Sequence, residues 1–176
     1  FQDVDIYQDQ FSLLQYPFDS PVSTAGIAFY KYYIMDTLYV ETDKCIHLTF
    51  VPNNSQDFGF TGHLYVLADS TYRVKQSVLN LPKKTDINFV TNMIIDQRFG
   101  ELPTGEWTLM EDDMICELAF WKKVSGHYMV RRTTRYFDFS FDPIPDKIFK
   151  KKGKEIKDVN AMMRDDEYWA QYRQED

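Results

Sequence analysis

The fold is decided by the stretch from residue 63 to residue 81, HLYVLADSTYRVKQSVLNL. It predicts a β-hairpin, with strands over His63 to Leu67 and Tyr72 to Leu81. Asp69 lies between the two strands, where a carboxylate can accept backbone N–H groups in an Asx turn. The second strand alternates apolar with polar residues, which is typical of an antiparallel sheet with one face in water.

Runs of the same character lie on both sides of this hairpin. Gly26 to Val40 predicts one long strand or a bent pair of strands, because Tyr and β-branched residues dominate and no helix cap stands out. Residues 4–15 fit either a short helix or an entering strand. Further strands are expected over Cys45 to Val51, Ile87 to Leu102, Trp107 to Met110, Met114 to Trp121 and Tyr128 to Phe141. The series predicts a mainly β fold, a curved antiparallel meander of about 8–9 strands that forms an open or half barrel.

The end of the chain changes character. We expect residues 1–142 to form the β domain and residues 143–157 to form a Lys-rich linker. The Lys run is interpreted first as solvated chain and second as a segment attracted to an anionic membrane surface. Residues 158–176 predict a C-terminal amphipathic helix, because apolar residues recur at helical spacing: Val159, Met162, Met163, Trp169 and Tyr172.

Composition narrows the class of protein. The chain has 176 residues, enough for one domain with a real core, and it carries 12 Tyr, 14 Phe and 3 Trp, which favour strands. The net charge of −7 and the dispersed basic residues argue against nucleic acid as a partner. No uncharged apolar stretch is long enough for a membrane-spanning helix. Because the chain begins without Met or an apolar signal core, we expect it to be a segment of a larger exported protein.

The residues that usually carry chemistry do not form a known motif. Cys45 and Cys116 are interpreted first as buried free thiols, with a disulfide as the alternative. His47, His63 and His127 occur singly and are expected to be structural. The acidic triplet at residues 111–113 is expected to be a solvated turn, since it lacks calcium-loop spacing. We therefore expect a non-enzymatic protein with no catalytic residues, no cofactor and no metal.

One pattern suggests a binding surface. Several central strands are apolar on both faces, so something must cover the second face of the sheet. The structural interpretation is that the N-terminal segment and the terminal helix pack against that face. The functional interpretation is an apolar groove that holds a lipid or docks a partner, with candidate lining residues Tyr65, Leu67, Phe89, Met93, Ile95 and Trp121.

The sequence also resembles a known family. The carrying motifs are DFGFTGHLYV at residues 57–66, DSTYRVK at residues 69–75, YIMDTL at residues 33–38, DINFV at residues 86–90 and RDDEYW at residues 164–169. They resemble the middle, periplasmic domain of large outer-membrane proteins that begin with a carboxypeptidase-regulatory-like module and end in a β-barrel. The hairpin is more loosely similar to half-barrel lipoprotein carriers of the periplasm. The resemblance implies a periplasmic location beside the membrane β-barrel of the same full-length protein, and it implies no functional residues.

Three functions follow as hypotheses. The first is a non-enzymatic periplasmic module that binds a lipid, a lipoprotein or a partner protein on a curved sheet. The second is a purely structural spacer that braces a barrel, which predicts a filled core without a groove. The third, an envelope hydrolase, requires a polar cleft with converging titratable groups.

Overall fold

The computed structural model describes residues 4–13, 16–54, 57, 59–81, 89–119 and 128–141. The chain divides into two compact units, residues 1–138 and 139–176, and the account below concerns the first. The predicted linker, the predicted C-terminal helix, Trp121 and His127 all lie outside the described residues. In the described part of the chain, no helix is long and apolar enough to cross a membrane.

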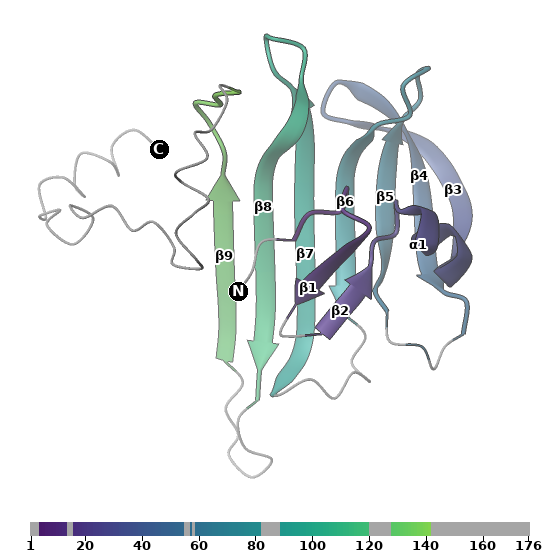
Figure 1. Cartoon of the computed structure of the whole chain (residues 1–176), viewed down its shortest axis with the longest axis vertical. Helices are drawn as coiled ribbons and strands as arrows, with labels where there is room; N and C mark the ends of the chain where they lie inside the picture. The colour runs from purple at the N-terminus through teal and green to yellow at the C-terminus, as the bar shows by residue number, and fades with distance from the viewer. Residues whose placement is uncertain are drawn as a thin grey trace, which may run out of the picture. The chain divides into compact units, whose positions relative to one another are not determined.

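A seven-stranded antiparallel sheet forms the body of the first unit (Figure 1). Its strands follow one another in sequence order, each hydrogen-bonded to the next. Among the described residues the sheet does not close, because β3 and β9 form its two edges. The strands are β3 (Tyr30–Val40), β4 (Asp43–Pro52), β5 (Thr61–Leu67), β6 (Val74–Leu81), β7 (Val90–Glu101), β8 (Trp107–Leu118) and β9 (Tyr128–Arg135). The predicted fold class, a mainly β antiparallel meander, is confirmed.

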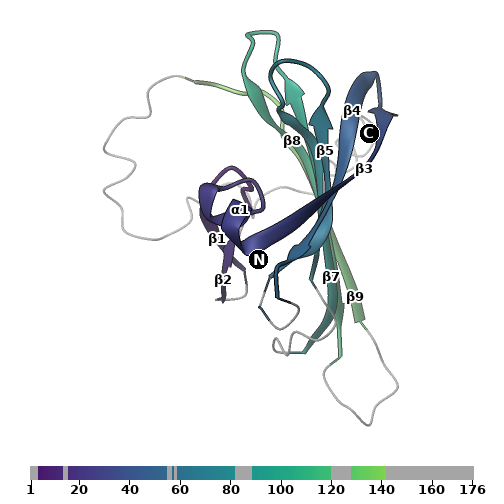
Figure 2. The same ribbon diagram turned by 90° about the vertical axis from the view of Figure 1, so that its right-hand side faces the viewer.

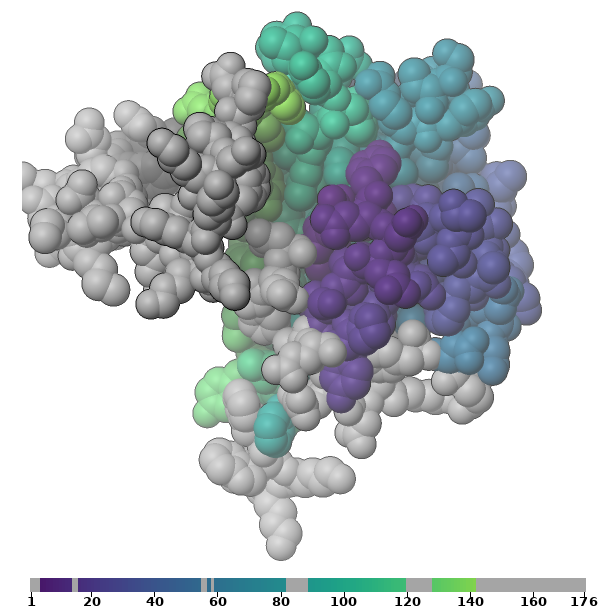
Figure 3. Space-filling model, viewed as in Figure 1, coloured from purple at the N-terminus to yellow at the C-terminus, as the bar shows by residue number. Residues whose placement is uncertain are grey.

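The N-terminal segment, residues 4–13 and 16–29, forms a small layer on one face of this sheet (Figure 2). It contains the hairpin of β1 (Gln10–Leu13) and β2 (Tyr16–Asp19), followed by α1 (Thr24–Phe29). The space-filling view shows this segment, in purple, lying over the strands (Figure 3). We call the covered face the inner face, defined by Phe50, Leu79, Ile95 and Met114, which lie in one cross-strand row. The opposite, outer face carries the row Thr49, His63, Val78, Asp96 and Asp113.

The core lies between the inner face and the N-terminal segment. Phe18 packs on Phe60 with ring centroids 4.5 Å apart, and Phe11 lies 5.7 Å from the same ring. Each such aromatic pair contributes about 0.5–1.5 kcal/mol beyond its buried area. The N-terminal segment therefore completes the core and is integral to the fold.

The helix α1 corrects the prediction that one long strand or a bent pair of strands begins at Gly26. Ser23 caps it, because its side-chain oxygen accepts a hydrogen bond from the Gly26 N–H at 2.9 Å. A serine before the first turn is a favoured N-cap. Gly26 sits against the backbone of Ser20, where a Cβ atom would have no room. The strand β3 therefore begins at Tyr30 and not at Gly26.

The acidic triplet corrects a second prediction, that of a solvated turn at residues 111–113. These residues lie inside β8, which runs unbroken from Trp107 to Leu118. Asp113 forms an ion pair with Arg131, and Asp112 with Arg132, each at 2.8 Å and diagonally across the β8–β9 pair. Opposite charges on neighbouring strands stabilise such pairs, so the triplet joins the edge strand to the sheet.

Candidate functional site

An apolar groove lies on the inner face beside the N-terminal segment. Its volume is about 430 Å³, within the range of about 300–1,000 Å³ that is usual for ligand sites. The floor comes from the sheet and the opposite side from the N-terminal segment. The groove is lined by Tyr7, Pro21, Val22, Ile27, Tyr32, Leu48, Leu64, Val66, Tyr72 and Val74.

The floor of the groove follows from strand alternation. Leu48 on β4 and Leu64 on β5 are directly opposite each other in the antiparallel register, so their side chains share a face. Val66 continues the same face of β5, next to a bulge that sets it opposite Val74 of β6. Branched apolar side chains from three strands thus form one continuous surface.

Two of the three tyrosines that line the groove, Tyr7 and Tyr32, have hydrogen-bonded hydroxyls. The Tyr32 hydroxyl donates to the Pro21 carbonyl oxygen at 2.7 Å, and the Tyr7 hydroxyl accepts from the Val74 N–H at 3.2 Å. Burial raises the pKa of Tyr32 to about 12, and burial also raises the pKa of Tyr7. Both phenols therefore stay neutral at physiological pH. The interior offers apolar contact rather than hydrogen bonds or charge.

The mouth of the groove exposes large apolar side chains. Ile27 is 71% exposed and Tyr72 is 67% exposed. Ile34 lies on the edge strand β3, opposite Leu48. The Ile34 residue is 77% exposed, and it extends the apolar surface beyond the groove. A contiguous exposed apolar surface of this kind is typical of binding sites.

Tyr72 reaches the mouth through an unusual backbone conformation. Its φ is 50°, in the left-handed region that non-glycine residues rarely occupy. The Asp69 carboxylate accepts hydrogen bonds from the N–H groups of Thr71 and Tyr72, so the predicted Asx turn is present and holds this conformation. Because strain of this kind is concentrated at functional sites, Tyr72 is a candidate functional residue.

The six residues predicted to line a groove do not share one surface. Met93 and Ile95 are fully buried in the core beneath the N-terminal segment. Tyr65 lies on the outer face, stacked on His47. Leu67 is buried beside a different pocket, and Phe89 is exposed just before β7. Trp121 lies outside the described residues.

Sequence reasoning missed the half of the groove that comes from the N-terminal segment. Tyr7 belongs to a stretch that fits either a helix or a strand, and Ile27 was assigned to a strand. The positions of Tyr7, Val22 and Ile27 at the groove depend on long-range packing. On the sheet side, Leu48 and Leu64 were recognisable as apolar positions of alternating strands. Their cross-strand pairing could not be read from the alternation alone.

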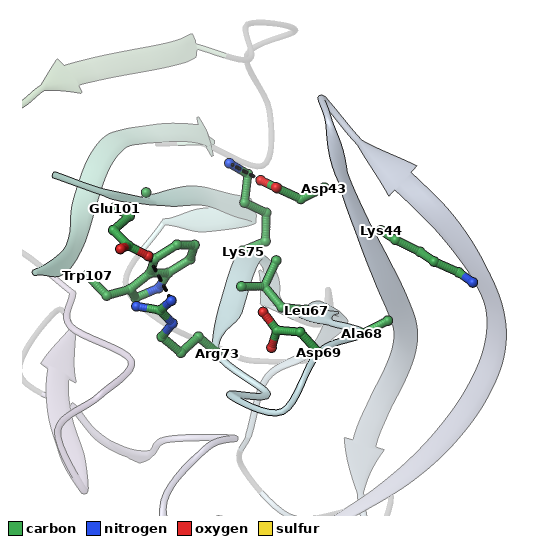
Figure 4. Close-up of a pocket in the computed structure, with 10 residues that line it drawn as sticks. Asp43, Lys44, Leu67, Ala68, Asp69, Arg73, Lys75, Glu101 and Trp107 are labelled. Atoms are coloured by element: carbon green, nitrogen blue, oxygen red, sulfur yellow. Dashed lines mark hydrogen bonds and ion pairs between the residues drawn. The ribbon is translucent and has the colours of Figure 1, made fainter. Parts of the chain in front are cut away.

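A second pocket, of about 490 Å³, lies at one end of the sheet, beside the turns between β3 and β4, between β5 and β6, and between β7 and β8 (Figure 4). Lys75 Nζ lies 2.9 Å from Asp43 Oδ2 and 3.0 Å from Glu41 Oε2. Arg73 lies over the Trp107 ring and pairs with Glu101 at 2.8 Å. Each of these cations therefore has a carboxylate partner, and the arrangement ties the hairpins together.

The two cysteines are free and buried, as first predicted. Cys116 belongs to the inner-face core. Cys45 lies directly opposite Leu67 in the β4–β5 register and is not part of that core cluster. Burial raises the pKa of both thiols, which keeps them protonated and unreactive.

Comparison with known proteins identifies a family. Residues 1–136 match the model of DUF5686, described as a family of unknown function. Neither the curated proteins nor the solved structures include a match to the chain. The matched segment contains the seven-stranded sheet, the N-terminal segment and the groove between them. Because the match spans more than half of the 176 residues, the chain belongs to DUF5686, a family of unknown function.

Proposed function

We propose that this domain is a non-enzymatic module that binds a single acyl chain, carried by a lipid or a lipoprotein, in the groove on its inner face. The observation that carries the proposal is the lining: apolar side chains line a volume of ligand size, and the hydroxyls of Tyr7 and Tyr32 are already hydrogen-bonded. Each methylene that leaves water contributes about 0.8 kcal/mol, and this gain needs no polar recognition. An acyl chain is the ligand whose chemistry matches such a surface.

The setting we propose is the periplasm, with this domain beside the membrane β-barrel of the same full-length protein. The motifs quoted above support this setting through their resemblance to outer-membrane proteins. In that position, a groove with an exposed apolar mouth would receive or deliver an acylated molecule next to the membrane. The exposed residues Ile27, Ile34 and Tyr72 would then contact either the ligand or the membrane surface.

Binding of a fluorescent fatty acid to the 176-residue chain tests the proposal. Ile27→Asp places a charge in the lining of the groove at an exposed position, so the fold should be retained. We expect the affinity for the probe to fall about tenfold or more, equivalent to about 1.4 kcal/mol. Val66→Trp, which fills the groove from the floor, should have the same effect.

The matched control is Met129→Asp. Met129 is 69% exposed on β9 and does not line the groove. The Met129→Asp variant should bind the probe with the affinity of the wild type. Organic extraction of the purified chain, followed by mass spectrometry, should recover a co-purified lipid, whereas an acylated peptide in the extract would indicate a lipoprotein. If the wild type binds no probe and yields no lipid, acyl-chain binding is excluded.

The second candidate is a structural domain that braces the barrel. The observation that favours it is the extent of the inner-face core, where Met93, Ile95 and Phe60 are fully buried by the N-terminal segment. A bracing domain would not bind the probe. The wild type and Ile27→Asp would then give the same negative result.

A further inference from the structure

Two histidines share a hydrogen bond on the outer face of the sheet. His47 lies on β4 and His63 on β5, and His47 Nε2 lies 3.0 Å from His63 Nδ1. Thr49 Oγ1 lies 3.1 Å from the same His63 nitrogen. The centroids of the two imidazole rings are 5.1 Å apart. Two side chains of the kind that titrates near neutral pH are therefore in direct contact.

A hydrogen bond between two nitrogens needs one proton between them, which limits how many protons the pair can take up. The Asp36 carboxylate lies 3.0 Å from His47 Nδ1 and can only accept, so it keeps a proton on that nitrogen. In the neutral pair, His47 Nε2 then accepts from His63 Nδ1, and one added proton on His47 merely reverses this bond. A second added proton would put N–H groups on both facing nitrogens, so the bond between the rings would be lost and two like charges would repel.

The surroundings of the pair supply only one countercharge. No described element packs over this part of the outer face (Figure 2). Asp36 is the one carboxylate in the described residues that contacts the pair. Asp96 accepts from Gln76 Nε2 at 2.8 Å and lies 3.8 Å from Arg98, so its charge is already compensated. The charged and titratable side chains around the two histidines on the described strands are Asp36, Tyr33, Tyr65, Asp96 and Arg98.

The second proton is therefore taken up only in acid. Burial, together with the charge of His47, holds the pKa of His63 below its ordinary value of 6.5. A histidine with a lowered folded-state pKa binds fewer protons than it does in the unfolded chain, so below about pH 6.5 acid favours states in which the two rings are separated.

The histidine pair lies directly behind the floor of the groove. Leu48 stands between His47 and Thr49 on β4, and Leu64 follows His63 on β5, so strand alternation places both leucines on the inner face. These leucines are opposite each other across the same two strands, and both line the groove. The bond between the imidazoles therefore ties together, from behind, the two strands that carry the floor.

We propose that a second proton on the His47–His63 pair weakens acyl-chain binding, so that the domain holds its ligand near neutral pH and releases it in acid. This regulation rests on the acyl-chain function proposed above. Loss of the hydrogen bond and repulsion between the two charged rings force β4 and β5 apart on the outer face, and the leucines on the other face of these strands move with them. By linkage, a protonation that weakens ligand binding must itself be opposed by the ligand.

Binding of a fluorescent lysophosphatidylcholine to the 176-residue chain between pH 7.5 and pH 4.5 tests the proposal. This probe carries one acyl chain, and the charge of its head group is constant over that range, whereas the charge of a fatty acid is not. We expect the wild-type affinity to fall at least about fivefold, the lower end of the usual coupling between two sites.

Two variants and a matched control assign this fall to the histidine pair. His47→Gln and His63→Gln should each bind the probe at pH 7.5 and lose less than about half of the effect in acid that the wild type shows, because a single imidazole meets no like charge. The chain contains a third histidine, so His127→Gln, which keeps the pair, should behave like the wild type.

Nuclear magnetic resonance of the imidazole protons gives a second readout. His63 should titrate at lower pH in the wild type than in His47→Gln, because the variant lacks the neighbouring charge. Saturating probe should move the wild-type titration of His63 further toward acid by about 0.7, which is the fivefold effect in its reciprocal form.

The outcomes separate this regulation from the function on which it rests. A wild-type affinity that is constant with pH, or the full wild-type fall in both His47→Gln and His63→Gln, would overturn the regulation and leave acyl-chain binding intact. Circular dichroism should show a folded chain at each pH, and unfolding of the wild type by pH 4.5 would also overturn the regulation. If the wild type binds no probe at pH 7.5, acyl-chain binding fails and the regulation fails with it.

Discussion

Asp112 Oδ2 lies 2.8 Å from Arg132 Nη2, and the Asp112 side chain is only 3% exposed. The same carboxylate accepts a hydrogen bond from Gln97 Nε2, which also donates to the Val4 carbonyl oxygen. One buried carboxylate thus connects the edge strand β9, through Gln97 on β7, to the N-terminal segment. The inner-face core and the edge of the sheet are linked at this point.

Asp112→Asn should therefore destabilise the domain strongly. Breaking a fully buried ion pair costs about 3–5 kcal/mol, and since Arg132 is partly exposed we expect about 2–4 kcal/mol here. Urea unfolding measures the change. Asp113→Asn, one residue along the same strand, is the comparison: its partner Arg131 is mostly exposed, so it should cost about 1 kcal/mol or less. Equal losses in the two variants would show that burial of Asp112 is unimportant.

The stability of the domain should also depend on pH through Asp113. Hydrogen bonding from Arg131, assisted by Thr133, holds the pKa of this carboxyl below its usual value of 3.8. A carboxyl with a lowered folded-state pKa binds fewer protons than the unfolded chain does, so its contribution is complete above about pH 4 and is lost as the pH falls further. The urea midpoint should fall on acidification below pH 4, and Asp113→Asn should show a smaller fall over that range. An identical acid profile in the variant would contradict this assignment.

The limits of sequence reasoning can be traced to particular residues. Strand alternation and the Asx turn at Asp69 were enough to predict the central hairpin and the antiparallel meander, because both signals are local. The acidic triplet was misread because its arginine partners, Arg131 and Arg132, lie on the next strand, and nothing local distinguishes a paired carboxylate from a solvated one. The lining residues of the groove could not be predicted for the same reason, since they depend on register and on long-range packing of the N-terminal segment.

Close packing at Gly62 provides a further test of the fold. A Cβ atom at this position would collide with the Val78 carbonyl oxygen on β6 and approach Phe50 Cζ to 3.0 Å. Gly62→Ala should destabilise the domain by about 1–3 kcal/mol, as overpacking of a core usually does. Thermal unfolding is a sufficient measurement. A variant as stable as the wild type would show that β5 and β6 can separate locally without cost.

Tyr72 should separate binding from stability. Its left-handed backbone costs a non-glycine residue about 1–2 kcal/mol, and glycine adopts the same conformation without that penalty. Tyr72→Gly should therefore be at least as stable as the wild type in urea unfolding, although it removes the exposed ring at the mouth of the groove. Its affinity for the fluorescent fatty acid should nevertheless fall. Tyr39→Gly is a suitable control, because Tyr39 is comparably exposed at 69% on β3 but does not line the groove. Loss of stability together with binding in Tyr72→Gly would mean that the ring supports the fold, whereas loss of binding alone would mean that the strained turn holds Tyr72 in place for the ligand.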